Sequence, residues 1–155
     1  MSKKAKKKCI VTSMDMFPFN NTVLFVAGDW RAAAKEIDKK IQVNDGNYED
    51  KASDRIFKLI DTSGFEYDSC KGMTIINEKI TSNLIVILMR SQNPLLRDVV
   101  HECHHATMVT LDRAGVNDVN HETSAYLLDC LFSVCLDALN KTKQTTQTRR
   151  TNEEV

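Results

Sequence analysis

One unbroken run of apolar residues, Leu84–Met89, constrains the fold of this chain more than any other feature. The run is far shorter than the roughly 20 residues that span a bilayer as a helix. The turn-forming segment from Ser91 to Pro94 follows the run, and the residues of the run favour a β-strand over positions 83–89. A strand without polar alternation is typically covered on both faces. We therefore expect a core strand here, the alternative being a segment that docks on a membrane or a partner.

The rest of the chain divides into short predicted strands and amphipathic helices. β-Branched and aromatic residues between turn formers predict strands at residues 10–13, 22–27, 65–68 and 73–76. Apolar residues spaced three and four apart predict helices at residues 29–41, 53–60 and 95–114, and a last helix that begins near Asn120. Gly115 is well placed to end the third helix in the left-handed conformation. The pattern indicates an α+β fold, in which a small, mostly antiparallel sheet packs on a few helices.

Length and composition favour one domain. The chain has 155 residues, enough for a core without disulfides, and we place the single domain at residues 9–140. Residues 1–8, which include five lysines, are predicted to form a basic disordered arm, and residues 141–155 a flexible polar tail. Five cysteines without a C-x-x-C pair are expected to be reduced and mostly buried, which argues against a cysteine zinc ribbon.

Charge and hydropathy limit the partners. Lys plus Arg and Asp plus Glu each number 21, so the net charge of zero gives no global attraction to nucleic acid or membrane. Contact with nucleic acid is expected only through the basic arm, which otherwise serves as a solubilising terminus. No apolar segment follows the arm, so we expect no export signal, no membrane partner and a cytoplasmic location. The sequence carries no signal for the oligomeric state.

The strongest chemical signal lies in the third predicted helix. Residues 101–105 form an H-E-x-x-H motif, and all four histidines of the chain fall between positions 101 and 121. His101 and His105 are four residues apart, so on a helix they share a face and match the spacing of two ligands of one zinc ion. Glu102 lies beside that metal position, where it can accept a proton from water. Cys103 is expected to face the core, and His104 to lie on the surface.

A catalytic zinc site needs a third ligand and an open position for water. Glu122 stands at the start of the last predicted helix, and an antiparallel helix pair would return it toward the histidine face. His121 is the rival third ligand; it points about a quarter-turn away, so the two cannot face the metal equally well.

The motif and the following Glu-x-x-Ala-Tyr string, residues 122–126, resemble the gluzincin class of zinc metallopeptidases. The resemblance is greatest to the very small versions found among bacteriophage proteins and in minimal SprT- or WSS-like domains. It covers roughly residues 83–139. It implies a compact zincin-like fold, zinc held by His101, His105 and Glu122, Glu102 as general base, and a strand that lines the cleft.

These observations favour a zinc-dependent hydrolase that cleaves a peptide or protein substrate. Glu102 would take the proton of the attacking water and pass it to the leaving amine. Tyr126, one turn after Glu122, would donate a hydrogen bond to the oxyanion, or would be a half-buried packing residue.

Two alternatives remain open. The chain would be a zinc-binding structural, assembly or host-interaction protein, of the kind a phage encodes, without peptidase turnover; it would then work in the host cytoplasm or the virion. Otherwise it would be a metal-free α+β binding domain in which the motif is accidental. An accessible edge strand beside the site would favour a peptide substrate, because extended chains bind by adding to a sheet edge.

Overall fold

The computed structural model describes residues 9–41, 51–62, 70–76, 83–116 and 121–153, with the side chains of the last segment described as far as Lys141. The elements in chain order are β1 (Cys9–Met16), β2 (Asn21–Gly28), α1 (Ala34–Lys40), α2 (Ala52–Thr62), β3 (Gly72–Ile76), β4 (Leu84–Met89), α3 (Leu96–Arg113) and α4 (His121–Glu153).

The strands form one mixed sheet in the order β1-β2-β4-β3. β1 pairs with β2 and β3 pairs with β4 in antiparallel fashion, whereas the central pair β2 and β4 is parallel. A parallel pair requires a crossover connection, which here contains α1, α2 and β3. The α+β class expected from the sequence is confirmed, and two of the three strand pairings are antiparallel.

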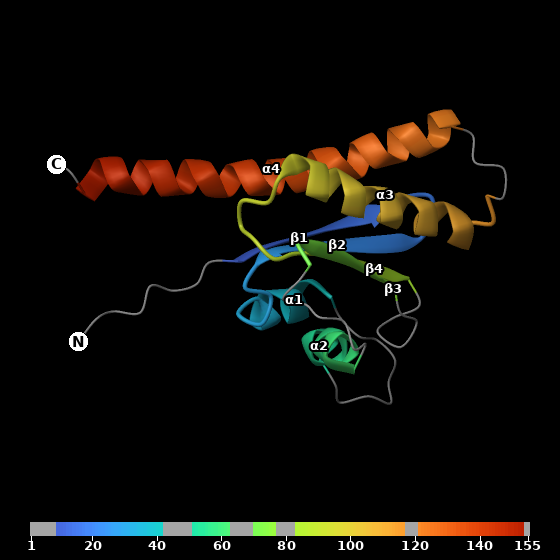
Figure 1. Cartoon of the computed structure of the whole chain (residues 1–155), viewed down its shortest axis with the longest axis horizontal. Coiled ribbons are helices and arrows are strands. Elements are labelled where there is room, and N and C mark those ends of the chain that lie inside the picture. The colour runs from blue at the N-terminus through green and yellow to red at the C-terminus, as the bar shows by residue number, and fades with distance from the viewer. Residues whose placement is uncertain (1–8, 42–50, 63–69, 77–82, 117–120, 154–155) are drawn as a thin grey trace.

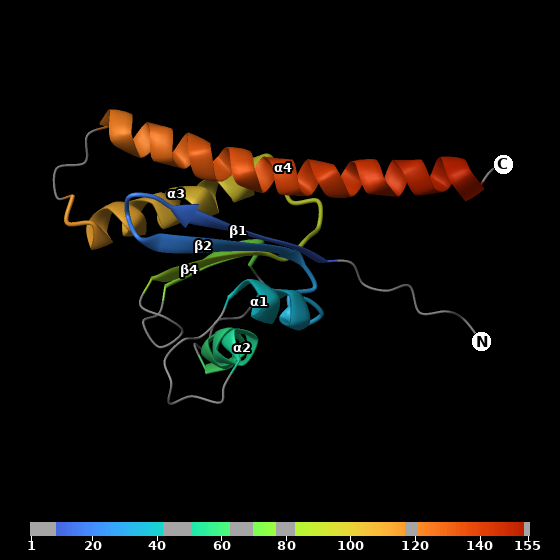
Figure 2. The ribbon, with the colours of Figure 1, turned by 180° about the vertical axis from the view of Figure 1, so that it is seen from behind.

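Helices cover both faces of the sheet, as the apolar run of β4 predicted. Figure 1 shows α1 and α2 below the sheet and α3 and α4 above it, and the view from behind in Figure 2 agrees. All six residues of β4 are buried. Because side chains alternate along a strand, they divide between two core clusters. Ile85, Ile87 and Met89 join the cluster with α3 and α4, and Leu84, Val86 and Leu88 join the one with α1 and α2.

α3 begins and ends where its sequence signals predict. Leu95, in an extended conformation, precedes its first turn, and Gly115 follows its last turn with a φ of 71°. The amide of Val116 donates to the carbonyl of Leu111 at 3.0 Å, and the amide of Gly115 donates to that of Asp112 at 2.9 Å. This is the Schellman arrangement, which a left-handed glycine favours. The chain therefore leaves α3 in a tight turn toward α4.

α4 returns antiparallel to α3 and packs on it and on β1 (Figure 1). Its described buried side chains are spaced four residues apart: Leu127, Leu131, Cys135 and Leu139. The sequence predicted a flexible tail from residue 141, but the backbone is helical as far as Glu153. No glycine or proline occurs in this segment to end the helix. Its C-terminal part extends beyond the sheet (Figure 2).

The remaining expectations about the fold have different outcomes. The helix predicted from residue 29 begins later, at Ala34, after a turn over residues 30–33. The predicted strand at residues 65–68 and the basic arm at residues 1–8 lie outside the described residues. In the part of the chain that the structure describes, no helix is both long enough and apolar enough to cross a membrane.

Candidate metal-binding and catalytic site

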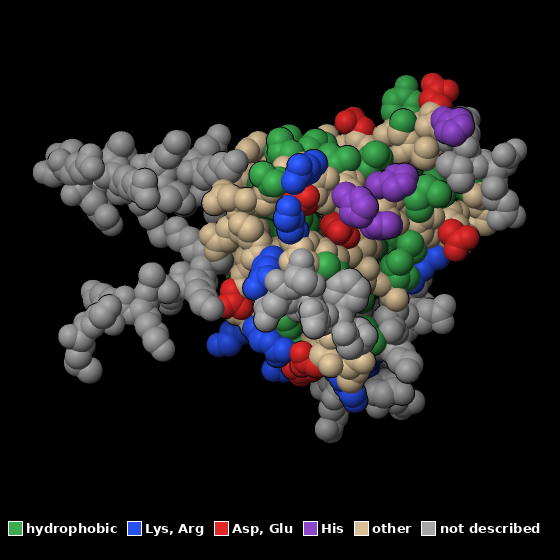
Figure 3. Space-filling model, in the orientation of Figure 1, with side chains coloured by type: hydrophobic (Ala, Val, Ile, Leu, Met, Phe, Trp, Pro, Cys, Tyr) green, Lys and Arg blue, Asp and Glu red, His purple; other side chains and the backbone are tan. Residues whose placement is uncertain are grey.

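The two motif histidines lie together on the exposed face of α3. His101 and His105 are one helical turn apart, and their rings meet edge to face with centroids 4.7 Å apart. The Nε2 atoms of the two rings are 3.1 Å apart. Figure 3 shows histidine side chains gathered in a patch on this surface, with hydrophobic, acidic and basic side chains near it. The i, i+4 spacing therefore brings two imidazole nitrogens to one point, as expected.

The geometry of this pair fits a zinc ion. Two nitrogens bound to one tetrahedral zinc at about 2.0–2.1 Å lie about 3.3 Å from each other. The observed Nε2–Nε2 separation of 3.1 Å, across which the two rings form a hydrogen bond, is close to that value. A bound zinc ion would replace that hydrogen bond, with the lone pairs of both rings turned toward the metal. Imidazole nitrogen is also a donor that zinc prefers. The pair can thus supply two ligands of a zinc site.

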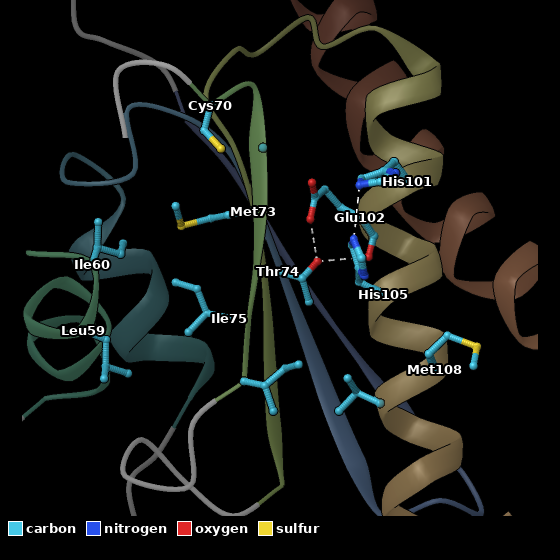
Figure 4. Close-up of a pocket in the computed structure, with 13 residues that line it drawn as sticks. Leu59, Ile60, Cys70, Met73, Thr74, Ile75, His101, Glu102, His105 and Met108 are labelled. Atoms are coloured by element: carbon cyan, nitrogen blue, oxygen red, sulfur yellow. Dashed lines mark hydrogen bonds between the residues drawn. The ribbon is translucent and has the colours of Figure 1, made fainter. Parts of the chain in front are cut away.

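Glu102 lies next to the pair and points toward the sheet. Its side chain extends from α3 to β3, while His101 and His105 stand one above the other beside it (Figure 4). The residue is 8% exposed. The hydroxyl of Thr74 on β3 lies 2.7 Å from Oε2 of Glu102 and 3.0 Å from its backbone carbonyl oxygen. A buried carboxylate is costly without a hydrogen-bond donor, and Thr74 provides one.

The histidine pair and Glu102 line one cavity of about 620 Å³. Its other walls are the edge strand β3, Leu59 and Ile60 of α2, and Met108 and Val109 of α3. Ile76 and Met108 are 44% and 37% exposed, so large apolar surface is open beside the histidines. The cavity therefore combines a few polar groups with apolar walls, which is typical of a small ligand or peptide site.

The other two residues of the motif take the places predicted for them. His104 is exposed. Cys103 is fully buried on the opposite side of α3, and its Sγ lies 3.8 Å from Sγ of Cys135 on α4. Contact with the Cys103 sulfur, together with burial, raises the pKa of the Cys135 thiol above its ordinary value. Both cysteines are core residues, and neither is a nucleophile that faces the cavity.

The same sulfur contact shows which residues of α3 and α4 lie level with each other. Glu122 precedes Cys135 by 13 residues, about 20 Å along a helix at 1.5 Å per residue. His105 is displaced from Cys103 by only two residues, about 3 Å, in that direction. Because α3 and α4 are antiparallel, Glu122 lies near the far end of α3, roughly 16 Å beyond the level of His105.

The structure does not bring the predicted third ligand or oxyanion donor to the histidine pair. Glu122 and Tyr126 are exposed on α4, Tyr126 at 70%, and the described residues that line the cavity include neither of them. His121, the rival ligand, is also exposed at the start of α4. Within the described residues, no group of three or more His, Cys, Asp or Glu side chains is gathered around one point. The roles of Glu122 and Tyr126 stay predictions from the sequence.

Two residues of β3 belong to the site and were not singled out from the sequence. Thr74 is the hydroxyl partner of Glu102. Gly72 leaves space for the stem of the same side chain, since a Cβ there would lie 3.1 Å from Cγ of Glu102. Both stand on one face of a five-residue strand, two positions apart. The alternation of side chains along the strand predicts that Gly72 and Thr74 share a face. Which element that face meets can be predicted only once the pairing of β3 with β4 is known.

The fold places the chain in the α+β class, with a mixed four-stranded sheet among its described residues. No family model matches its sequence, and comparison with curated proteins and with solved structures also yields no match. The functional argument therefore depends on the geometry of this site.

Proposed function

We propose that this chain is a zinc-dependent hydrolase, and more specifically a small metallopeptidase. The observation that carries the proposal is the pair of Nε2 atoms 3.1 Å apart beside the buried carboxylate of Glu102, in one cavity. His101 and His105 would hold the metal. Glu122, the third ligand predicted from the sequence, lies roughly 16 Å beyond the level of His105 along α3 in this structure, so it would bind only if α4 moved. A bound zinc ion would acidify water and polarise the substrate carbonyl.

Glu102 would do the proton transfer. As the water oxygen attacks the carbonyl carbon, the Glu102 carboxylate takes one proton from it. When the carbon–nitrogen bond breaks, Glu102 gives that proton to the leaving amine. The buried position of Glu102, 8% exposed, keeps competing water away from the carboxylate.

The position of β3 supports a peptide as the substrate. β3 is an outer strand of the sheet, and within the described residues no strand pairs with its other edge. The same strand lines the cavity that holds the histidine pair. An extended peptide that pairs with this edge would place its carbonyl groups beside the histidines. The apolar surface of Ile76 and Met108 would favour a large apolar side chain in that peptide.

A second candidate function is a zinc-binding structural or assembly protein without turnover. Within the described residues two histidines meet without a third protein ligand, so a catalytic site is not complete there, and a closed structural site, which ordinarily has four protein ligands, is further from complete. A catalytic zinc site ordinarily has three protein ligands and an open position. The two candidates agree on the metal and differ only in hydrolysis, so one set of variants separates them.

The test measures zinc binding and peptide hydrolysis in parallel. Purified protein is expected to bind zinc and to gain about 2.7 kcal/mol of unfolding free energy when free zinc is 100-fold above its Kd. His101→Ala should abolish that gain, and His104→Ala, an exposed neighbour on the same helix, should keep it. Glu102→Gln should retain zinc and lose hydrolysis of a fluorogenic peptide library.

Each outcome selects one function. Zinc binding with hydrolysis that depends on Glu102 supports the metallopeptidase. Zinc binding without hydrolysis supports the structural protein. A protein that zinc does not stabilise excludes both and leaves a metal-free binding domain.

A further inference from the structure

The general base of the proposed site is held by a residue that lies on another element. The single hydroxyl proton of Thr74 can be donated to one acceptor at a time, and two lie within reach: Oε2 of Glu102 at 2.7 Å and its backbone oxygen at 3.0 Å. The carboxylate oxygen is the closer and the charged acceptor, so it forms the stronger bond. The dashed lines of Figure 4 connect Thr74 across the gap between β3 and α3.

Packing below the carboxylate acts in the same direction. Gly72 places only a hydrogen against the Glu102 stem, because a Cβ there would lie 3.1 Å from Cγ of Glu102 and 2.8 Å from Sδ of Met89. Met89, the other side chain beside that position, is fully buried. The Glu102 side chain is thus seated on β3, with its outer end reached by the Thr74 hydroxyl.

This seat matters because a carboxylate beside zinc has two possible roles. Aspartate and glutamate oxygens are ordinary zinc ligands at about 2.0–2.2 Å. A glutamate that binds the metal occupies the position that water needs and can no longer accept the proton of that water. Glu102 follows His101 directly on α3 and so points about a quarter-turn away from it, and the Thr74 hydrogen bond holds its carboxylate against β3 in that direction.

We infer that Thr74 is a positioning residue that holds the Glu102 carboxylate on β3, so that Glu102 acts as a base and not as a metal ligand. The inference rests on the proposed zinc hydrolase function. It also connects the strand that would pair with substrate to the proton-transfer group, because Thr74 belongs to the edge strand itself. A peptide that docks along β3 would therefore meet a base whose position is set by the same strand.

The test compares Thr74→Val with Thr74→Ser. Valine keeps the β-branched shape and removes the hydroxyl, whereas serine keeps the hydroxyl and removes the methyl group. Thr74→Val is expected to lower kcat about 100-fold with KM nearly unchanged, the scale on which a misplaced catalytic group reduces rate. Thr74→Ser, which keeps the hydroxyl, should retain most of the wild-type kcat. A Thr74→Val variant with wild-type kcat, or a Thr74→Ser variant that is equally impaired, would overturn the inference.

A second measurement, zinc affinity, tests the restraint on the Glu102 carboxylate without relying on hydrolysis. Zinc affinity is determined by competition with a chelator for the wild type, Thr74→Val, and the double variant Thr74→Val/Glu102→Gln. Release of the carboxylate should tighten zinc binding in Thr74→Val by about tenfold, the scale of neighbouring-group effects on zinc affinity. The double variant should lose that gain, because a neutral amide is a poor zinc ligand. Equal affinity in all three proteins would contradict the restraint.

Different results overturn the proposed function and the positioning role of Thr74. A wild type that neither binds zinc nor hydrolyses peptides overturns the proposed function, and the positioning role with it. A wild type that binds zinc and hydrolyses peptides, combined with an unaffected Thr74→Val, overturns the positioning role alone.

Discussion

Gly72→Ala tests directly how tightly β3 packs against the base. Gly72 does not have a positive φ, so its backbone accepts alanine. The obstacle is space, since the new Cβ would lie 2.8 Å from Sδ and 3.0 Å from Cε of Met89, and 3.1 Å from Cγ of Glu102. A contact shorter than 3.0 Å requires a neighbour to move. Sδ and Cε are the flexible end of the Met89 side chain and can shift, but only within a buried core, whereas Glu102 is held by Thr74.

The expected cost follows from two opposing effects. Insertion of a methyl group into a filled core costs about 1–3 kcal/mol. Replacement of glycine by alanine also restricts the unfolded chain, which returns about 0.4–1 kcal/mol. The free energy of unfolding should therefore fall by about 1 kcal/mol, with a further loss of hydrolysis as the Glu102 stem is displaced. Zinc retention should change little, because none of the three atoms nearest to the added Cβ belongs to a histidine.

Urea denaturation of the metal-free protein measures the change, with Gly115→Ala as the matched control. Gly115 has a φ of 71°, and a methyl group added there would meet no atom within 4 Å. Its substitution therefore costs stability through the backbone alone and leaves the cavity intact. Met89→Ala removes the side chain that the new methyl group would meet. If it relieves the strain that Gly72→Ala creates, the double variant will be more stable than the sum of the two single changes predicts. A Gly72→Ala protein as stable as the wild type, with additive energies in the double variant, would refute the packing argument.

Three further predictions concern the ligand set, the apolar wall and the long helix. Glu122→Ala should weaken zinc retention during dialysis against a chelator more than His121→Ala does, and the opposite ranking would assign the third ligand to His121. Met108→Gln should keep zinc and raise KM about tenfold for peptides with a large apolar side chain, a factor that corresponds to ~1.4 kcal/mol of lost apolar burial; unchanged KM values would remove this side chain from the substrate site. Leu131→Ala should cost about 2–5 kcal/mol of unfolding free energy. Truncation after Lys141 should change the free energy of unfolding by less than about 0.5 kcal/mol, because the described buried residues of α4 end at Leu139. If the truncation costs as much as Leu131→Ala, the part of α4 after Lys141 stabilises the core.

The parts of the fold that the sequence predicted are those that depend on local patterns. The apolar run of β4 requires cover on both faces because each alternate side chain needs a partner, and the two core clusters supply it. The end of α3 at Gly115 follows from one residue that adopts a positive φ without a steric cost. The closeness of His101 and His105 likewise follows from the pitch of a single helix.

The parts that it missed depend on how separate elements meet. Nothing in the composition of β3 distinguishes Thr74 from any other threonine in a strand. Its role emerges only when β3 occupies the sheet edge next to α3, which brings its hydroxyl to Glu102. The level of Glu122 along α3 is also a tertiary property, because it depends on how α4 packs against α3, and the contact between Cys103 and Cys135 shows that level.

Whether Glu122 can be the third zinc ligand therefore depends on how far α4 can slide along α3. To bring Glu122 level with His105, α4 would have to slide by roughly 16 Å, about three turns, along α3. Such a slide would remove Leu131, Leu139 and their neighbours from the core, at about 1.5–3 kcal/mol for each large apolar side chain. Zinc binding at structural sites supplies about 10–16 kcal/mol, which is of the same order as that cost. If Glu122→Ala weakens zinc retention, α4 must therefore leave its present packing on Cys103 when metal binds. In that case Cys135, which is buried here, should become reactive toward alkylating reagents in the zinc-loaded protein alone.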